Sequence, residues 1–462
     1  MHSGLTIIYS RKNKMHKINH ANIKDWAKNY DGPLFDGILC DPPYELGFMG
    51  KSWDSSGIAF DTEMWADILK LLKPGAHLLA FSGSRTYHRM AVAIEDAGFE
   101  IRDMIEWVYG SGFPKSLNIG KAVDKLQGND REVVGITPAG KGIASGGSYV
   151  GQEYAGEHNI TKGTSEWEGY GTALKPAHEP ICMARKPLSE KTVAENCLKW
   201  GTGGINIDES RVPAGEDHKK NATRHTNKIY PGGFNDSPIN SDANPLGRFP
   251  ANLIHDGSDE VVGLFPQTKS GGGTKVTGNG EVKQATWTLN RKEKGKEWQA
   301  NSGSASRFFF TAKPDEEMYS LKYCAKASKR ERNAGLDDMP DMPMAMSNQA
   351  KAELKRGNTD FAGHKEGDWN GIKMLKNNHP TVKPLSLTKY LATLIKPPTG
   401  GRLLVPFSGS GSEMIGALQA GWEYVEGVEL TEEYIPIAEA RIKYWLDQMA
   451  QEDAKPKQVG LV

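Results

Sequence analysis

Four consecutive residues, Asp41-Pro42-Pro43-Tyr44, have groups suited to activating an amino group on a nucleobase. Such an exocyclic amine is a poor nucleophile, because its lone pair is delocalised into the ring. The Asp41 carboxylate and the carbonyl of Pro42, held outward by the rigid proline pair, can accept both amine hydrogens and localise that lone pair. Tyr44 offers a flat face on which an extruded base can stack. For the tetrapeptide alone, a simple strand-ending turn is the alternative.

A second candidate site lies near the C-terminus, where the apolar segment 402–406 runs into a glycine-rich turn. Glycines let a backbone approach a ligand closely. A helix-like stretch, 413–420, follows the turn, and the next strand-like segment ends in Glu429, whose carboxylate can accept hydrogen bonds from ribose hydroxyls. An ordinary tight turn is the alternative for the glycines alone. The whole succession predicts a site for an adenosine-type cofactor, with the turn residues Phe407, Ser408, Gly409 and Gly411 in contact with it.

At these two motifs the chain resembles the β class of S-adenosylmethionine-dependent DNA methyltransferases, which modify exocyclic amino groups. The motif order is that of the class, with Asp-Pro-Pro-Tyr first and Phe-x-Gly-x-Gly last. The segment 379–384, His-Pro-Thr-Val-Lys-Pro, is similar to the motif before the cofactor strand, which assigns Thr381 and Lys383 to the cofactor. The segments 48–54, 107–115 and 247–252 resemble phage and prophage members of the class.

The resemblance implies S-adenosyl-L-methionine as cofactor, double-stranded DNA as partner, and direct methyl transfer to a flipped-out base without a metal. Aspartate at position 41 favours N6 of adenine over N4 of cytosine, which is the alternative. It also disfavours protein glutamine and RNA methylation, whose families often begin the tetrapeptide with Asn. Val405 stands where the family commonly has an acid, and Asn22 where Gly-Asp is frequent. These two departures predict weaker cofactor binding and favour another alternative, a catalytically weak DNA-binding or decoy protein.

The composition predicts a soluble intracellular enzyme, and the resemblance implies the cytoplasm of a bacterial or phage-infected cell. The chain has 462 residues, zero net charge, and length enough for two or three domains. No apolar run approaches the roughly 20 residues that span a bilayer, and residues 1–11 lack the apolar core of a signal peptide. The four cysteines show no metal-ligand spacing, and none follows a proline, so the nucleophile of cytosine ring-carbon methyltransferases is absent. Monomer and homodimer both stay open.

Positive charge is concentrated between residues 269 and 332, where basic residues outnumber acidic ones by fourteen to seven. Trp287, Trp298 and the phenylalanines at 308–310 are interleaved with them. Cations that neutralise phosphates and aromatic rings that stack on bases occur together in nucleic-acid sites, although a solvated basic face is the alternative. The residues predicted to contact DNA are Lys51, Trp53, Arg291, Lys292 and Arg307.

Alternating strand-like and helix-like patterns predict an α/β fold around a mainly parallel, doubly wound sheet. The sequence places strands at 35–40, 77–81 and 101–108, helices at 63–72 and 87–97, and a strand at 179–184 that pairs with 101–108. The resemblance makes this a Rossmann-like methyltransferase sheet, circularly permuted and carrying a large loop-rich insertion.

The expected parts are a catalytic half at 1–188 with an insertion at 111–172, a target-recognition region at 189–371, a cofactor-binding half at 372–446 and a polar tail at 447–462. Because ligands bind at the carboxyl ends of the strands, Pro42 and Phe407 should face each other across the crevice between the two halves. Sequence specificity is expected between residues 188 and 371, where regular patterning fades.

Overall fold

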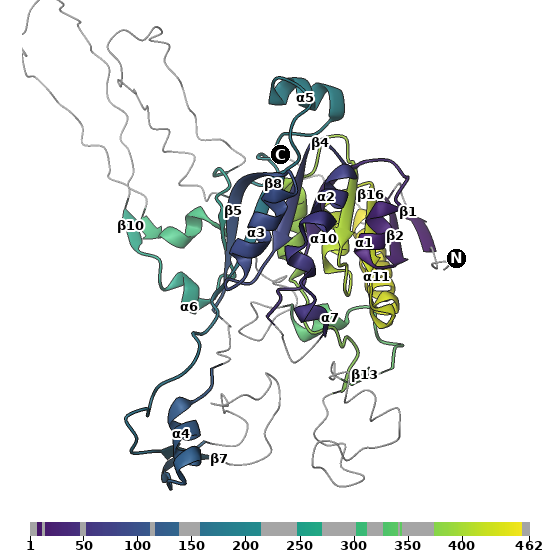
Figure 1. Cartoon of the computed structure of the whole chain (residues 1–462). Helices are drawn as coiled ribbons and strands as arrows, with labels where there is room; N and C mark the ends of the chain where they lie inside the picture. The colour runs from purple at the N-terminus through teal and green to yellow at the C-terminus, as the bar shows by residue number, and fades with distance from the viewer. Residues whose placement is uncertain are drawn as a thin grey trace, which may run out of the picture.

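The computed structural model describes residues 7–11, 14–46, 52–110, 116–137, 158–213, 247–269, 302–311, 327–340, 342–343 and 374–454. In this part of the chain, one ten-stranded sheet forms the centre of the molecule (Figure 1). Its strands, in spatial order, are β1 (Ile7–Arg11), β2 (Lys14–His20), β16 (Tyr424–Glu429), β15 (Arg402–Pro406), β3 (Phe35–Cys40), β4 (Leu72–Phe81), β8 (His178–Arg185), β5 (Glu100–Val108), β9 (Leu253–His255) and β12 (Phe310–Thr311).

The centre of this sheet is parallel, as the sequence predicts. Strands β2, β16, β15, β3 and β4 run in the same direction. Strand β8 is antiparallel to both β4 and β5, which confirms that 179–184 pairs with 101–108. Strands β9 and β12 continue the sheet parallel to β5, and β1 adds an antiparallel edge. The mainly parallel α/β fold is therefore confirmed.

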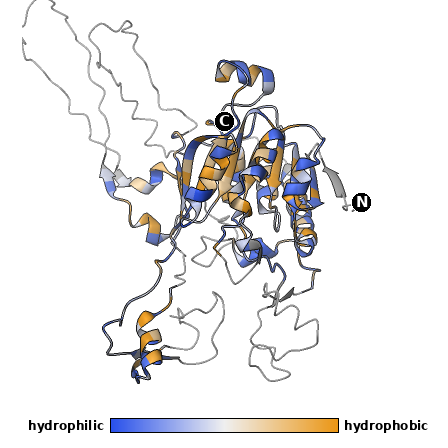
Figure 2. Cartoon of the chain, viewed as in Figure 1, coloured by the Kyte–Doolittle hydropathy of each residue, from blue (hydrophilic) through white to orange (hydrophobic). Residues whose placement is uncertain are grey.

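Helices cover both faces of the sheet (Figure 1). On one face lie α1 (Ile23–Lys28), α2 (Thr62–Lys70) and α3 (Tyr87–Asp96), and on the other lie α9 (Leu385–Leu394), α10 (Ser412–Ala420) and α11 (Ile435–Ala454). Successive strand residues point to opposite faces, so Ile38 and Leu404 pack with the first helices, and Leu39 and Leu403 with the second. Figure 2 shows the hydrophobic residues concentrated in these central strands.

Residues between β5 and β8 form a small unit outside the main sheet, at the lower left of Figure 1. It contains α4 (Ile119–Gln127) and the antiparallel pair β6 (Glu132–Thr137) and β7 (His158–Lys162). Arg131 links its parts, through ion pairs with Asp124 and, at 2.9 Å, with Glu168. The insertion expected at 111–172 thus lies where β5 ends and β8 begins.

The region 189–371 contains more regular structure than its sequence pattern predicts. Within its described residues, the helices are α5 (Val193–Trp200), α6 (Asp259–Val262) and α7 (Lys329–Asn333), and the short strands outside the main sheet are β10 (Gln267–Lys269), β11 (Ser302–Ser304) and β13 (Met342–Pro343), which pairs with β14 (Met374–Leu375). Strands β9 and β12 belong to the main sheet, which therefore extends past the expected boundary at residue 188. Strands of two or three residues are too short to produce a recognisable alternation.

Short 3₁₀ helices lie at the loops, namely η2 (Ser52–Ser55), η3 (Ile58–Phe60), η5 (Ala305–Phe308) and η8 (Glu432–Tyr434). Within the described ranges, no helix has the length and apolarity that crossing a membrane requires.

Asp36 joins the two halves of the sheet, which come from opposite ends of the chain. Strands β3 and β15 pair with Leu404 beside Ile38. The Asp36 side chain is buried, and its Oδ2 accepts a hydrogen bond from the Arg402 backbone N–H at 2.8 Å, while Oδ1 accepts one from Lys73 Nζ at 2.7 Å. The Asp36 carboxylate therefore links its own strand, β3, to β15 and β4.

We expect Asp36→Asn to lower the free energy of unfolding by about 1.5–3 kcal/mol, because a charged acceptor for two donors is lost. Urea denaturation measures this change. Glu95→Gln, an exposed carboxylate on α3, is the control and should stay within about 0.5 kcal/mol of the wild type. Equal unfolding midpoints for Asp36→Asn and the wild type would contradict the role of Asp36.

Candidate active site

Asp41 lies at the carboxyl edge of the sheet, directly after strand β3. All six residues of β3 are buried, and the tetrapeptide that follows has no regular structure. Continuing the register between Leu404 and Ile38 brings Asp41 level with Phe407 at the end of β15. The two sequence motifs therefore lie side by side at the edge where α/β sheets bind ligands.

Asp41 forms a buried ion pair with Lys383. Lys383 Nζ lies 2.5 Å from Asp41 Oδ2, and the two side chains are 6% and 12% exposed. Asp41 Oδ1 is also buried, and among the described residues it accepts no hydrogen bond. Burial raises the pKa of the Asp41 carboxyl, and the Lys383 charge opposes that rise. Since a buried acceptor without a donor costs about 1–3 kcal/mol, Oδ1 is suited to take a donor from a bound molecule.

Lys383 lies between two carboxylates and two aromatic rings. Its Nζ is 3.5 Å from Glu179 Oε2, and it lies over the rings of Phe81, at 4.7 Å, and Tyr44, at 5.2 Å from the centroids. Burial alone would lower the pKa of the ammonium, but the charges of Asp41 and Glu179 raise it above its ordinary value. The side chain is therefore a cation. It was expected to contact the cofactor, and the structure pairs it with Asp41.

Tyr44 is held by Glu179 and Thr86. Its hydroxyl donates to Glu179 Oε2 at 2.8 Å, and its carbonyl accepts from Thr86 Oγ1 at 2.8 Å. The Tyr109 hydroxyl donates to the other Glu179 oxygen at 3.3 Å. Burial raises the pKa of both phenols, which therefore stay protonated donors. Sequence reasoning missed Glu179; the available signal was an acid at the start of an otherwise apolar strand.

The glycine-rich turn has the backbone conformation that its sequence predicts. Gly409 and Gly411 have φ of 50° and 82°, and Phe407 also has a positive φ of 62°, which is uncommon for a residue with a side chain. Arg441, fully buried on α11, donates from Nη1 to the Ser410 carbonyl at 2.5 Å and hydroxyl at 3.0 Å. The sequence contained no signal for Arg441.

Glu429 lies beside this turn, at the end of β16. Its Oε2 accepts from the Gly409 N–H and its Oε1 from the Thr431 N–H, each at 2.7 Å. Burial raises the pKa of the carboxyl, and these two backbone donors oppose the rise. A carboxylate oxygen can accept a second hydrogen bond, so the carboxylate keeps acceptor capacity.

The segment 379–384 closes over the glycine turn. His379 Nε2 lies 2.7 Å from the position that a Cβ on Gly409 would take, so no side chain fits there. The Nδ1 of the same ring bonds to the Thr381 carbonyl, while Thr381 itself is exposed. Burial lowers the pKa of His379 to about 3, so its ring is neutral.

Helix α7, from the region 189–371, supports this segment. Arg332 Nη2 donates to the His379 carbonyl at 2.7 Å, and the Leu385 N–H donates to Glu331 Oε1 at 2.5 Å. These contacts connect α7 directly to the predicted cofactor motif.

The two departures from the family pattern have structural roles. Val405 is fully buried in β15 and packs in the core beneath α9 and α10. Asn22 begins α1, where its side chain accepts a hydrogen bond from the Lys24 N–H at 3.0 Å. The neighbouring Ala21 N–H donates to the Glu429 carbonyl at 3.0 Å, which places 20–22 beside the predicted ribose acid.

Of the predicted DNA contacts, Arg307 is the one whose side chain lies within the described residues. Lys51, Arg291 and Lys292 lie outside the described residues, as does the side chain of Trp53. Arg307 precedes β12, at the opposite end of the strand from the carboxyl edge. Its Nη1 donates to the Gly303 and Ser304 carbonyls at 2.5 and 2.6 Å, and its guanidinium lies 4.4 Å from the Phe308 ring centroid.

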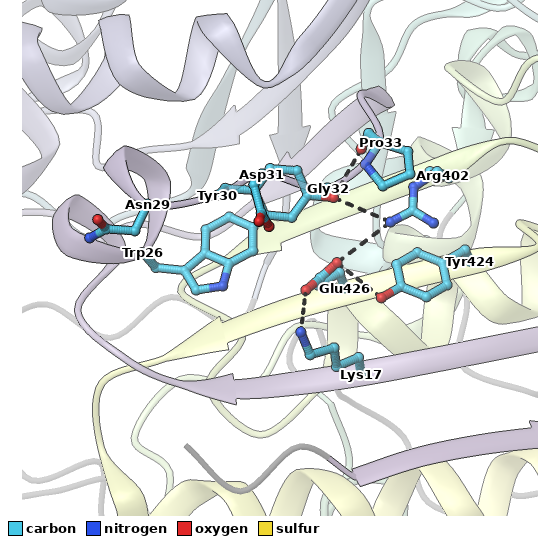
Figure 3. A pocket seen from close by; sticks show the side chains of 10 residues that line it. All are labelled: Lys17, Trp26, Asn29, Tyr30, Asp31, Gly32, Pro33, Arg402, Tyr424 and Glu426. Carbon is cyan, nitrogen blue, oxygen red and sulfur yellow. Dashed lines mark hydrogen bonds and ion pairs between the residues drawn. The ribbon is translucent and has the colours of Figure 1, made fainter. Parts of the chain in front are cut away.

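A cavity of about 310 Å³ lies away from this chemistry (Figure 3). Its lining includes Arg402 and Tyr424, the first residues of β15 and β16, and the Arg402 guanidinium stacks 3.8 Å from the Tyr424 ring centroid. Glu429 is at the other end of β16, about 17 Å along the strand. The cavity therefore belongs to the amino edge of the sheet, and not to the predicted active site.

Glu413 places another carboxyl beneath the site. It is 5% exposed in the first turn of α10. Burial, and then the charge of Asp41, raises the pKa of its carboxyl to about 7. Sequence reasoning missed it, because an acid in the first turn of a helix is ordinary.

We expect the contribution of Glu413 to the stability of the protein to fall as the pH rises from about 4.5 to about 7, because the folded chain holds the Glu413 proton more tightly than the unfolded chain. This stabilisation is complete below the ordinary pKa of 4.5 and is lost as the pH rises through about 7. The slope is at most about 1.4 kcal/mol per pH unit. Urea denaturation at several pH values across this range should show that the free energy of unfolding of Glu413→Gln, relative to that of the wild type, rises with pH. Equal slopes would contradict this role.

Comparisons with known proteins find likenesses to DNA methyltransferases. The chain is 26% identical over 147 residues to the type II methyltransferase M.HindIII of Haemophilus influenzae, an alignment that covers 31% of this chain and 37% of that protein. Alignment with the M1.HpyAVI–SAM complex covers 93% of this chain and 99% of that one, at 13% identity and a TM-score of 0.34. Alignment with PvuII DNA methyltransferase (cytosine-N4-specific) covers 94% and 92%, at 10% identity and a TM-score of 0.38.

A family model also matches most of the chain. The N6/N4 family model, described as DNA methylase, matches residues 35–440, which include the tetrapeptide, the 379–384 segment, the glycine turn and Glu429. This chain therefore belongs to the N6/N4 DNA methylase family.

Proposed function

We propose that this protein is an S-adenosyl-L-methionine-dependent DNA methyltransferase that acts on N6 of adenine. The observation that carries the proposal is the buried Asp41 carboxylate, which keeps one oxygen without a donor and has Tyr44 three residues away. An acceptor and a flat ring at one loop are what an exocyclic amine on an extruded base requires.

The residues at the end of β15 and β16 fit an adenosine-type cofactor. Gly409 and Gly411 leave the backbone free of side chains, and Glu429 offers acceptor capacity beside them. S-adenosylmethionine supplies an electrophilic methyl group on a positively charged sulfur. The chain's own part is to hold the ribose with Glu429 and to keep the turn rigid through Arg441.

The chain's residues act mainly on the target base. Extrusion from the duplex costs a few kcal/mol, and stacking on Tyr44 offsets part of it. Asp41 Oδ1 and the Pro42 carbonyl accept the two amine hydrogens, which localises the nitrogen lone pair for attack on the methyl carbon. As the nitrogen–carbon bond forms, the nitrogen becomes positively charged and must lose one of its two protons. Asp41 is the group placed to accept that proton.

The choice of adenine is supported by the family resemblance of the tetrapeptide, which begins with Asp. Expression in a host without DNA methylation, followed by modification-sensitive sequencing, tests the proposal directly. N6-methyladenine in a fixed sequence context is the expected result. Finding N4-methylcytosine would show that cytosine, the alternative target, is the base that is modified. An unmodified genome would favour the DNA-binding or decoy alternative.

We expect Asp41→Ala to lower the rate of methyl transfer by at least about 100-fold, since the lost group acts on the transition state. Affinity for S-adenosylhomocysteine, measured by calorimetry, should change little. The control is Asp41→Ala combined with Lys383→Met. It should be equally inactive, because the loss comes from the missing Asp41 acceptor and not from the Lys383 charge that remains in Asp41→Ala. A near wild-type rate for Asp41→Ala would refute the mechanism.

Glu429→Ala should weaken cofactor binding by roughly 1.5–3 kcal/mol, because a charged hydrogen-bond acceptor is lost. Calorimetric titration with S-adenosylhomocysteine measures the change, and a thermal melt shows whether the variant is folded. Glu432→Ala, an exposed carboxylate three residues away, serves as the control and should bind normally. Unchanged affinity in folded Glu429→Ala would move the ribose site elsewhere.

A further inference from the structure

Glu179 contacts three groups of the proposed active site, although it belongs to none of the sequence motifs. It lies on β8, and its side chain is 15% exposed. One oxygen accepts from the Tyr44 hydroxyl at 2.8 Å and lies 3.5 Å from Lys383 Nζ, while the other accepts from the Tyr109 hydroxyl at 3.3 Å. Three donors thus converge on one carboxylate.

Lys383 holds the carboxylate that the target amine must reach. Its Nζ is 2.5 Å from Asp41 and 3.5 Å from Glu179, and it also lies over one face of the Tyr44 ring. While the ammonium stays on Asp41, it withdraws electron density from the acceptor that should localise the amine lone pair. Moving the ammonium toward Glu179 keeps it paired, and the shift needed is on the order of 1 Å, the difference between the two distances.

We infer that Glu179 is a positioning residue for methyl transfer, which fixes the Tyr44 ring through its hydroxyl and takes over the Lys383 ammonium when the target amine engages Asp41. This inference rests on the proposed function. It assigns two separable tasks to one carboxylate: the hydrogen bond to Tyr44 needs only an acceptor, whereas the exchange of Lys383 needs a negative charge.

The surroundings allow this exchange. Asp41 follows β3, Phe81 ends β4, Tyr109 follows β5 and Glu413 lies in the first turn of α10. The charged members of this group are Asp41, Glu179, Glu413 and Lys383, and Glu179 is the second carboxylate within ion-pair distance of Lys383 among the described residues. The rings of Phe81 and Tyr44 border the ammonium on its path.

The test compares Glu179→Gln with Glu179→Ala in the full-length protein. Gln keeps an acceptor for Tyr44 and removes the charge, and Ala removes both. Glu100→Gln is the matched control, because Glu100 is a carboxylate on β5 that pairs with a β8 cation, Arg185, outside the site. The readouts are kcat, the KM of cofactor and DNA, and the fluorescence of 2-aminopurine at the target position of a substrate duplex, identified by the methylation sequencing.

The two Glu179 variants should differ in a defined way. Glu179→Gln should lower kcat by about 10- to 100-fold, with both KM values and the 2-aminopurine signal near wild type. Glu179→Ala should lower kcat at least as much and also reduce the 2-aminopurine signal, because the ring is no longer fixed. Glu100→Gln should match the wild type in every readout.

A wild-type kcat for Glu179→Gln would overturn the inference, as would an equal loss in Glu100→Gln. If Glu179→Gln shows only a lower melting temperature or a raised cofactor KM, the inference is also overturned, since those changes indicate a merely structural role. These three outcomes leave the proposed function intact. Absence of DNA methylation by the wild type, with S-adenosylhomocysteine bound, would instead refute the proposed function and this inference with it.

Discussion

The proposed active site depends on the ion pair between Asp41 and Lys383. Both side chains are almost fully buried, so each charge loses hydration that only a close partner can offset. The partners come from opposite ends of the chain and meet only because β3 and β15 are neighbours in the sheet. Asp36 stabilises the same seam from its other end through the Arg402 backbone. The order of the strands in the sheet therefore determines whether these two buried charges can pair.

The glycine turn is limited instead by the space available for side chains. His379 occupies the position that a Cβ on Gly409 would need, and α7 holds the His379 carbonyl through Arg332. The turn is thus enclosed by a segment from elsewhere in the chain, while Glu429 closes it from the sheet side. Because α7 contributes to this enclosure, the region between the two halves is structurally coupled to the cofactor motif.

Local motifs were predictable from the sequence, and long-range partners were not. The tetrapeptide, the glycine turn and Glu429 follow strands, so their place at the carboxyl edge could be inferred from neighbouring residues. Glu179 and Arg441 act through residues more than 30 positions away, and no local pattern identifies such contacts. Strands β9 and β12 were missed for another reason, since two or three residues cannot show a period. Lys383 was found by resemblance, but its pairing with Asp41 required the fold.

The charges around Lys383 also suit the proposed chemistry. Asp41, Glu179 and Glu413 surround this one cation, and Glu429 and the Arg441 guanidinium lie at the glycine turn nearby, so these four carboxyls outnumber the two bases, Lys383 and Arg441. Such an excess attracts a positively charged sulfonium and gives no comparable attraction to the neutral thioether left after transfer. The target amine is stabilised at the same time, because it becomes more positive as the new bond forms. The same carboxylates that cost free energy on folding therefore favour the reactant over the product.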